Sequence, residues 1–210
     1  MDGMKPQLRR ALLILAIGAL VIAGVAAGVW YLRGDNAEIR SGGVVSGGGS
    51  NIGGAFQLTD QDGQRRSQAD FAGKYVLVYF GFTYCVDACP LALLTMTQAL
   101  DRLPPAVADK VQPLFVTVDP ARDDPAQIKT YLENFHPRFV GLTGTPEEIA
   151  AAARAWRVVY EPPKPAADGT YQVNHTTIVY LMGPDGAFLR HFDHLTKAEE
   201  MTEALQALVK

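Results

Sequence analysis

The first hydrophobic feature of the chain is an apolar segment near the N-terminus. No charged residue occurs from Ala11 to Leu32. At about 1.5 Å of rise per residue, a helix of this length reaches about 33 Å, which matches the roughly 30 Å hydrocarbon core of a bilayer. Lys5, Arg9 and Arg10 precede the segment, and basic residues favour the cytoplasmic side. The pattern predicts a transmembrane anchor over 11–32, with residues 1–10 in the cytoplasm.

A cleaved secretory signal is the alternative interpretation of this segment. Val25, Ala26 and Ala27 offer a small-residue cleavage site. The apolar run is longer than the 7 to 15 residues usual in a signal peptide, which favours the anchor. Both interpretations export the rest of the chain.

The segment over 33–54 is rich in Gly and Ser and has no hydrophobic periodicity. Such a sequence behaves as a flexible coil, and about 20 residues of it have a root-mean-square reach of about 25 Å. We expect a tether that lets the following domain sample the space above the bilayer, which favours a membrane-bound target. A plain spacer explains the same composition.

From Ala55 onward the pattern alternates between strand and helix. Continuous apolar runs predict buried strands, apolar residues at helical spacing predict helices, and turn residues separate the members of two hairpins. The expected elements are a hairpin over 55–68, strands over 75–83 and 111–118, helices over 91–103, 125–135 and 147–156, a hairpin of strands 176–182 and 187–192, and a helix over 198–209. This order predicts one α/β domain over 55–210, a mixed sheet flanked by helices, and it fits thioredoxin-like topology.

The net charge of the predicted domain limits the kinds of partner that we expect it to bind. The chain carries 19 basic and 22 acidic side chains, a net charge of −3. From Gly34 onward 15 basic and 21 acidic residues remain, a net charge of −6. An acidic domain argues against nucleic-acid binding and is compatible with a basic protein partner or with cations.

The two cysteines of the chain, Cys85 and Cys89, follow the predicted strand over 75–83. Chemistry in open α/β sheets gathers where strands end and helices begin. Pro90 biases Cys89 away from helical geometry and is itself favoured as the first residue of a helix. Both sulfurs should therefore lie near a helix N-terminus, which favours thiolate over thiol. A metal-binding pair, a redox dithiol and a structural disulfide are the three interpretations.

Three segments carry a resemblance to a known family. GFTYCVDACP at 81–90, VTVDPARDDP at 116–125 and NHTTIVYLMGPDG at 174–186 resemble the copper-site loop, the Asp-Pro motif and the ligand-histidine segment of the Sco/SenC proteins. The resemblance runs from about Phe56 to the C-terminus. It implies a thioredoxin-like fold, copper as Cu(I) or Cu(II), and assembly of cytochrome c oxidase. With the export topology it implies a single-pass protein of the inner (cytoplasmic) membrane whose domain lies in the periplasm.

Four histidines compete to be the third ligand. Two thiolates suffice for linear Cu(I), whereas Cu(II) needs more donors, for which imidazole is suitable. His175 precedes a predicted strand, and thioredoxin-like folds place the start of that strand beside the cysteine loop, so the resemblance favours His175. His136 is interpreted as structural or solvated. His191 and His194 are interpreted as solvated, with an exposed secondary site as the alternative.

Asp119 directly follows the predicted strand over 111–118. Asp-Pro commonly opens turns, which explains the residue without a functional role. In the family this acid is associated with the metal site or its immediate support, so the resemblance makes Asp119 a residue that supports the ligands. Both interpretations stay open. Asp87, between the cysteines, needs no special role.

The functional hypothesis is a metallochaperone rather than an enzyme. Reduced Cys85 and Cys89 hold Cu(I), and His175 completes a site that also holds Cu(II). Thiolates of a partner displace the cysteines one at a time. The resemblance makes that partner the cytochrome c oxidase subunit with the copper A site, with other copper chaperones or thiol reductants as further partners. The alternatives are a thiol-disulfide oxidoreductase that keeps the oxidase cysteines reduced, and a redox or copper sensor; zinc also suits these ligands.

Overall fold

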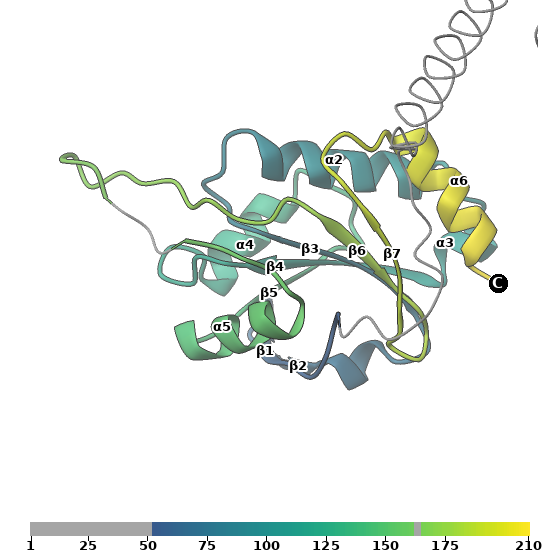
Figure 1. The fold of residues 1–210 in the computed structure, drawn as a ribbon, viewed down its shortest axis with the longest axis horizontal. Coiled ribbons are helices and arrows are strands. Elements are labelled where there is room, and N and C mark those ends of the chain that lie inside the picture. The colour runs from purple at the N-terminus through teal and green to yellow at the C-terminus, as the bar shows by residue number, and fades with distance from the viewer. Residues whose placement is uncertain (1–51, 162–164) are drawn as a thin grey trace, which may run out of the picture. The chain divides into compact units, whose positions relative to one another are not determined.

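The computed structural model describes residues 52–161 and 165–210 (Figure 1). The predicted cytoplasmic N-terminus, the predicted anchor over 11–32 and most of the predicted linker lie outside the described residues. Within the described ranges, no helix is both long enough and apolar enough to cross a membrane.

One mixed sheet of seven strands forms the centre of the domain. Its strands lie in the order β2-β1-β5-β4-β3-β6-β7. The three central strands β3, β4 and β5 are parallel, and the strands on either side pair antiparallel (Figure 1). The bounds are β1 Gln57–Asp60, β2 Arg65–Ser67, β3 Tyr75–Gly81, β4 Val111–Thr117, β5 Val140–Thr143, β6 Val179–Met182 and β7 Phe188–Phe192.

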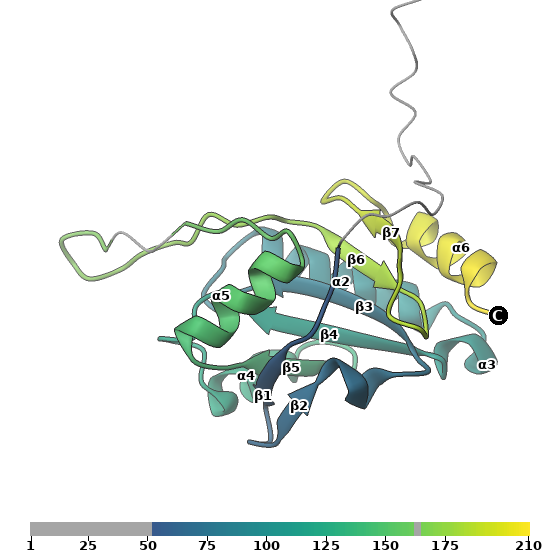
Figure 2. The same cartoon turned by 60° about the horizontal axis from the view of Figure 1, so that its bottom comes forward.

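Helices cover both faces of this sheet. The bounds are η1 Gln68–Phe71, α2 Ala88–Asp101, α3 Pro105–Ala108, α4 Pro125–Leu132, α5 Pro146–Ala155 and α6 Ala198–Leu208. Helices α2 and α6 lie side by side, with the Thr202 hydroxyl donating to the Ala99 carbonyl at 3.3 Å. Helix α5 covers the opposite face (Figure 2).

Alternation along β3 explains how both faces are buried. Tyr79 points to the α2 side, whereas Phe80 packs on Trp156 at the end of α5, with 5.9 Å between ring centroids. In β4, Phe115 packs on Tyr131 of α4 at 5.6 Å. A strand covered on both faces is apolar at every position. This explains the continuous hydrophobic runs of β3 and β4, whose carboxyl ends meet at one edge of the sheet.

The expected elements are confirmed, with no boundary displaced by more than about three residues, but the pattern did not predict β5, α3 and η1. Strand β5 has only four residues and contains Gly141, which weakens a strand pattern. The glycine has a packing reason: a Cβ added to Gly141 would lie 2.7 Å from Cδ1 of Leu132 in α4. The missing side chain therefore lets α4 pack closely on β5.

Candidate metal centre

The connection from β3 to α2 carries both thiols. Cys85 is half-buried in the loop, and Cys89 is fully buried as the second residue of α2. The expectation that Pro90 would start the helix and leave Cys89 outside it was wrong, because α2 begins at Ala88. The first amides of a helix have no partner within it, so proline is tolerated inside the first turn. The expectation that both sulfurs lie near a helix N-terminus is confirmed.

Backbone groups hold the two sulfurs close together. The backbone N–H of Cys89 donates to Sγ of Cys85 at 3.3 Å. On its other side Cys89 packs against the end of β3, where a Cβ added to Gly81 would lie only 2.9 Å from the Cys89 sulfur. The absence of a side chain at Gly81 therefore makes room for the buried thiol.

His175 reaches the thiols because β6 pairs with β3. The residue lies in the segment that leads into β6, separated from Val179 by residues 176–178, and forms an isolated bridge with Tyr160. Its Nε2 is 3.4 Å from Sγ of Cys89, and its Nδ1 is 2.9 Å from the carbonyl oxygen of Thr176. A carbonyl only accepts, so Nδ1 carries the proton and donates, which leaves the Nε2 lone pair directed at the thiols.

Two aromatic rings fix the orientation of the imidazole. The His175 ring meets Tyr79 edge to face at 6.0 Å between centroids and Phe82 at 5.7 Å. Both aromatic residues belong to the β3 segment that leads into the cysteine loop. The loop and the histidine are therefore packed against one another through apolar contacts as well as through their polar atoms.

The predicted convergence of the three residues is confirmed. The candidate ligand atoms of Cys85, Cys89 and His175 all lie within 4.8 Å of one another. Within residues 52–161 and 165–210, no other group of three or more His, Cys, Asp or Glu residues is arranged to hold a metal ion. Two sulfurs and one imidazole nitrogen form a soft donor set suited to copper or zinc.

The two thiols differ in acidity. A hydrogen bond from the Cys89 thiol, together with hydrogen bonds from the backbone N–H groups of Asp87 and Cys89, lowers the pKa of Cys85 to about 4. The hydrogen bond to Cys85 also raises the pKa of Cys89, and burial adds to this effect. At neutral pH the accessible sulfur is a thiolate, and the buried sulfur keeps its proton.

This difference predicts selective alkylation of the metal-free reduced protein. Because the Cys85 pKa is lowered, its thiolate persists as the pH falls from 9 to about 5, and it is lost only as the pH passes through about 4. Iodoacetamide at pH 6 should modify Cys85 at least about tenfold faster than Cys89, as read by peptide mass spectrometry. Equal rates at the two cysteines would contradict the assignment.

Asp119 is placed at the end of β4, but its hydrogen bonds reach none of the three candidate ligands. Its buried carboxylate accepts from Nε of Arg122 at 2.6 Å and from the Tyr171 hydroxyl at 2.9 Å. The role of Asp119 in supporting the metal site stays a prediction.

Asp123 was missed from the sequence. Its fully buried carboxylate accepts from the backbone N–H and hydroxyl of Thr83 at 3.0 and 2.6 Å, and from the Thr117 hydroxyl at 2.6 Å. Burial raises the pKa of this carboxyl group. Asp123 therefore fixes the residue two positions before Cys85. The sequence did contain a sign of this role. Two acidic residues precede Pro125, but only one of them, Asp124, is needed to cap α4.

The other histidines lie outside the ligand group. His136 accepts from the backbone N–H of Arg138 through Nδ1 at 3.2 Å, and burial lowers its pKa. His191 stacks on Phe188 with 6.3 Å between centroids. His194 lines a cavity of about 190 Å³ beside the first turn of α2. These contacts agree with a structural role for His136 and leave the role of the other two histidines open.

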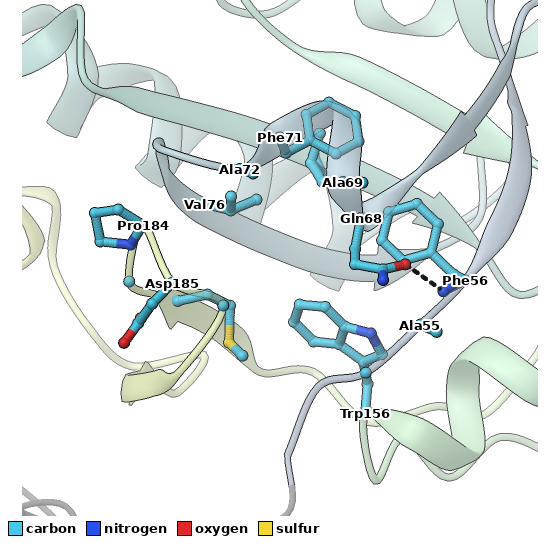
Figure 3. Close-up of a pocket in the computed structure, with 15 residues that line it drawn as sticks. Ala55, Phe56, Gln68, Ala69, Phe71, Ala72, Val76, Trp156, Pro184 and Asp185 are labelled. Carbon is cyan, nitrogen blue, oxygen red and sulfur yellow. Dashed lines mark hydrogen bonds between the residues drawn. The ribbon is translucent and has the colours of Figure 1, made fainter.

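A larger cavity of about 400 Å³ lies away from the thiols (Figure 3). It is on the other face of the sheet, where Phe56, Phe71 and Trp156 line it. Gln68 accepts there from the backbone N–H of Phe56 at 3.1 Å. The lining is mainly apolar and contains none of the candidate ligands, so the size of a cavity does not identify the chemical site in this domain.

Comparison with known proteins identifies similar sequences. The SCO1/SenC family model matches residues 45–210. The human mitochondrial SCO1 homolog is 42% identical over 155 residues, which are 73% of this chain and 52% of that protein. The mitochondrial SCO2 homolog of Danio rerio is 42% identical over 160 residues, 75% of this chain and 57% of that protein. The chain thus spans little more than half the length of these relatives.

Solved structures show the same fold. The copper-bound structure of ScoI from Bradyrhizobium japonicum matches with a TM-score of 0.69 at 41% identity, covering 74% of this chain and 98% of that one. BsSco, a member of the Sco family of cytochrome c oxidase assembly proteins in which a disulfide switch was identified, matches with a TM-score of 0.61 at 27% identity, covering 75% and 93%. The mixed sheet flanked by helices is therefore the thioredoxin-like architecture of these proteins.

Proposed function

Because the chain belongs to the SCO1/SenC family, we propose that it is a membrane-anchored copper metallochaperone that delivers copper to the copper A site of cytochrome c oxidase during assembly. The observation that carries the proposal is the meeting of Cys85, Cys89 and His175 within 4.8 Å. Copper bound to the Bradyrhizobium relative supports the metal. The assignment of BsSco to oxidase assembly supports the partner.

The three proposed ligands contribute differently to the binding of Cu(I) and of Cu(II). Cys85 and Cys89 supply two soft sulfur donors, which satisfy linear Cu(I). His175 offers Nε2, because its Nδ1 proton is directed at the Thr176 carbonyl. The imidazole adds the borderline donor that Cu(II) requires.

Transfer is proposed to begin at Cys85. This sulfur is half-buried and acidic, whereas Cys89 is fully buried in α2. A partner thiolate approaching from solvent can replace Cys85 as a ligand, after which a second partner thiolate replaces Cys89. Stepwise exchange keeps the metal bound to sulfur throughout and releases none to solvent.

The location of the domain is part of the proposal. We assign residues 1–10 to the cytoplasm, 11–32 to the anchor, 33–54 to the linker and 55–210 to the copper-binding domain. The absence of charge from Ala11 to Leu32 supports a single span of the inner membrane. Two unpaired thiols suit a periplasmic domain that is maintained by a reductant.

A second candidate is a thiol-disulfide oxidoreductase that keeps the copper-site cysteines of the oxidase reduced. Its support is the contrast between the accessible, acidic Cys85 and the buried Cys89. Such a pair suits an attacking and a resolving thiol. The disulfide switch of BsSco is in keeping with this chemistry.

Anaerobic titration of the reduced chain with Cu(I), Cu(II) and Zn(II) tests the proposed function. We expect one Cu(I) bound per chain. Cys85→Ser or Cys89→Ser should lower the Cu(I) affinity by more than about a hundredfold, because loss of a coordinating sulfur should exceed the 10- to 100-fold effect of losing an outer contact. Competition with a chelator of known affinity measures the change.

Either of two results would contradict the proposed function. If both serine variants bind copper as tightly as the wild type, or if the wild type holds Zn(II) against excess Cu(I), the chain is not a copper chaperone acting through these ligands. Dithiol exchange with an oxidised peptide would then favour the oxidoreductase.

A further inference from the structure

Arg122 contacts both segments that supply the candidate ligands. It lies on the turn after β4, where its backbone N–H donates to the Asp119 carbonyl at 3.2 Å. From this turn the guanidinium extends between the cysteine loop and the segment that leads to His175. Neither the family motif nor the proposed transfer assigns a role to this side chain.

Aromatic rings from the two segments surround the guanidinium. Its carbon lies 3.5 Å from the ring centroid of Tyr171 and 4.7 Å from that of Tyr84. Tyr84 immediately precedes Cys85, and Tyr171 is four residues before His175. A third ring, Phe82, lies 5.8 Å from the same carbon and also meets the imidazole of His175 edge to face.

Hydrogen bonds fix the orientation of the guanidinium plane. Nε donates to the buried carboxylate of Asp119 at 2.6 Å, and Nη1 donates to the Tyr171 carbonyl at 3.2 Å. The Tyr171 hydroxyl donates to the same carboxylate at 2.9 Å. A planar cation that pairs through its edge and stacks through its faces can hold all of these groups at once, which an ammonium cannot do.

We propose that Arg122 is a positioning residue that holds the His175 segment against the cysteine loop, so that the third ligand is in place before copper enters. This inference rests on the proposed function and adds a residue to it. It also gives Asp119 a defined part: its carboxylate anchors Arg122 rather than contacting the metal ligands. Gln172 joins the same two segments through a 3.4 Å hydrogen bond to the Tyr84 carbonyl.

Loss of this positioning should weaken the binding of Cu(II) much more than the binding of Cu(I). Cu(I) is satisfied by the two thiolates of one loop, whereas Cu(II) also needs the imidazole. In the Arg122→Lys variant the Cu(II) affinity should fall about tenfold or more, as for other residues that orient a ligand. The Cu(I) affinity should change by less than about threefold, and the thiolate-to-Cu(II) charge-transfer band should weaken.

Arg190→Lys is the matched control. Arg190 also pairs with a carboxylate, Glu200 at 3.1 Å, and lies over an aromatic ring, Phe192 at 5.0 Å. Its side chain is 16% exposed, against 22% for Arg122. It belongs to β7, and these two contacts involve neither the cysteine loop nor the segment that leads to His175, so its replacement should leave both copper affinities unchanged.

A measurement without copper separates this inference from the proposed function. The backbone N–H of Glu161 donates to the Asn174 carbonyl, and the backbone N–H of Thr176 donates to the Val159 carbonyl. These two bonds hold the backbone on either side of His175. Hydrogen exchange at both amides should rise at least about threefold in metal-free Arg122→Lys and stay at the wild-type rate in Arg190→Lys. Failure of the wild type to bind copper would sink the proposed function but leave this effect measurable.

The following results would contradict a positioning role for Arg122. Copper affinities equal to those of Arg190→Lys, or equal losses of Cu(I) and Cu(II) affinity with a lower melting temperature, would show that Arg122 does not position the histidine. Faster exchange without a loss of Cu(II) affinity would have the same meaning. Should Arg122→Lys not fold, Tyr84→Leu removes a stacking partner at a side chain that is 46% exposed and must then show the selective Cu(II) loss.

Discussion

Replacement of His175 by Ala is expected to lower the affinity for Cu(II) by more than about a hundredfold and that for Cu(I) by less than about tenfold. The difference arises because the two sulfurs come from one short connection and stay paired without the imidazole, through the 3.3 Å bond from the Cys89 amide to Cys85. Titration of the reduced chain with each ion, against a chelator of known affinity, measures both changes.

The same variant separates the two candidate functions. Exchange with a disulfide requires Cys85 and Cys89 but not a third metal ligand, so the dithiol reaction of His175→Ala should stay within about threefold of the wild-type rate. His191→Ala is the control, because His191 stacks on Phe188 at the surface and lies outside the ligand group. Equal losses for Cu(I) and Cu(II), or no loss for either ion, would contradict the assignment of His175.

The sequence predicted the parts of the site that depend on strand ends. Continuous apolar runs identified β3 and β4, and any residue that follows such a strand reaches the edge of the sheet where Cys85 lies. His175 could be placed beside the cysteines only through family resemblance, because its position depends on the antiparallel pairing of β6 with β3. No periodicity within one segment reports which strands become neighbours.

The residues that support the candidate ligands could not be predicted from the sequence for a related reason. Asp123 and Asp124 are identical in type and adjacent, yet one is buried beneath the cysteine loop and the other caps α4. Tyr171 lies in a polar stretch without periodicity, and its contact with Arg122 spans 49 positions of the chain. Such contacts are fixed by tertiary packing, so a local pattern gives no sign of them.

Replacement of Asp123 by Ala should give the largest loss of stability among these variants. It leaves the amide and hydroxyl of Thr83 and the hydroxyl of Thr117 without their acceptor inside the domain. Each buried donor left unpaired costs about 1 to 3 kcal/mol, and rotation of the hydroxyls reduces the total. We expect the free energy of unfolding to fall by about 3 kcal/mol and the melting temperature by roughly 10 °C.

Two neighbouring variants show whether the buried acceptor is the cause. Asp123→Asn keeps one acceptor oxygen and the shape of the side chain, so its cost should be about 1 kcal/mol. Asp124→Ala removes only the cap of α4, also about 1 kcal/mol, and should leave copper binding unchanged. Because Thr83 leads directly into the cysteine loop, Asp123→Ala should lower the Cu(I) affinity as well. Equal stability losses for Asp123→Ala and Asp124→Ala would show that the buried carboxylate does not anchor the loop.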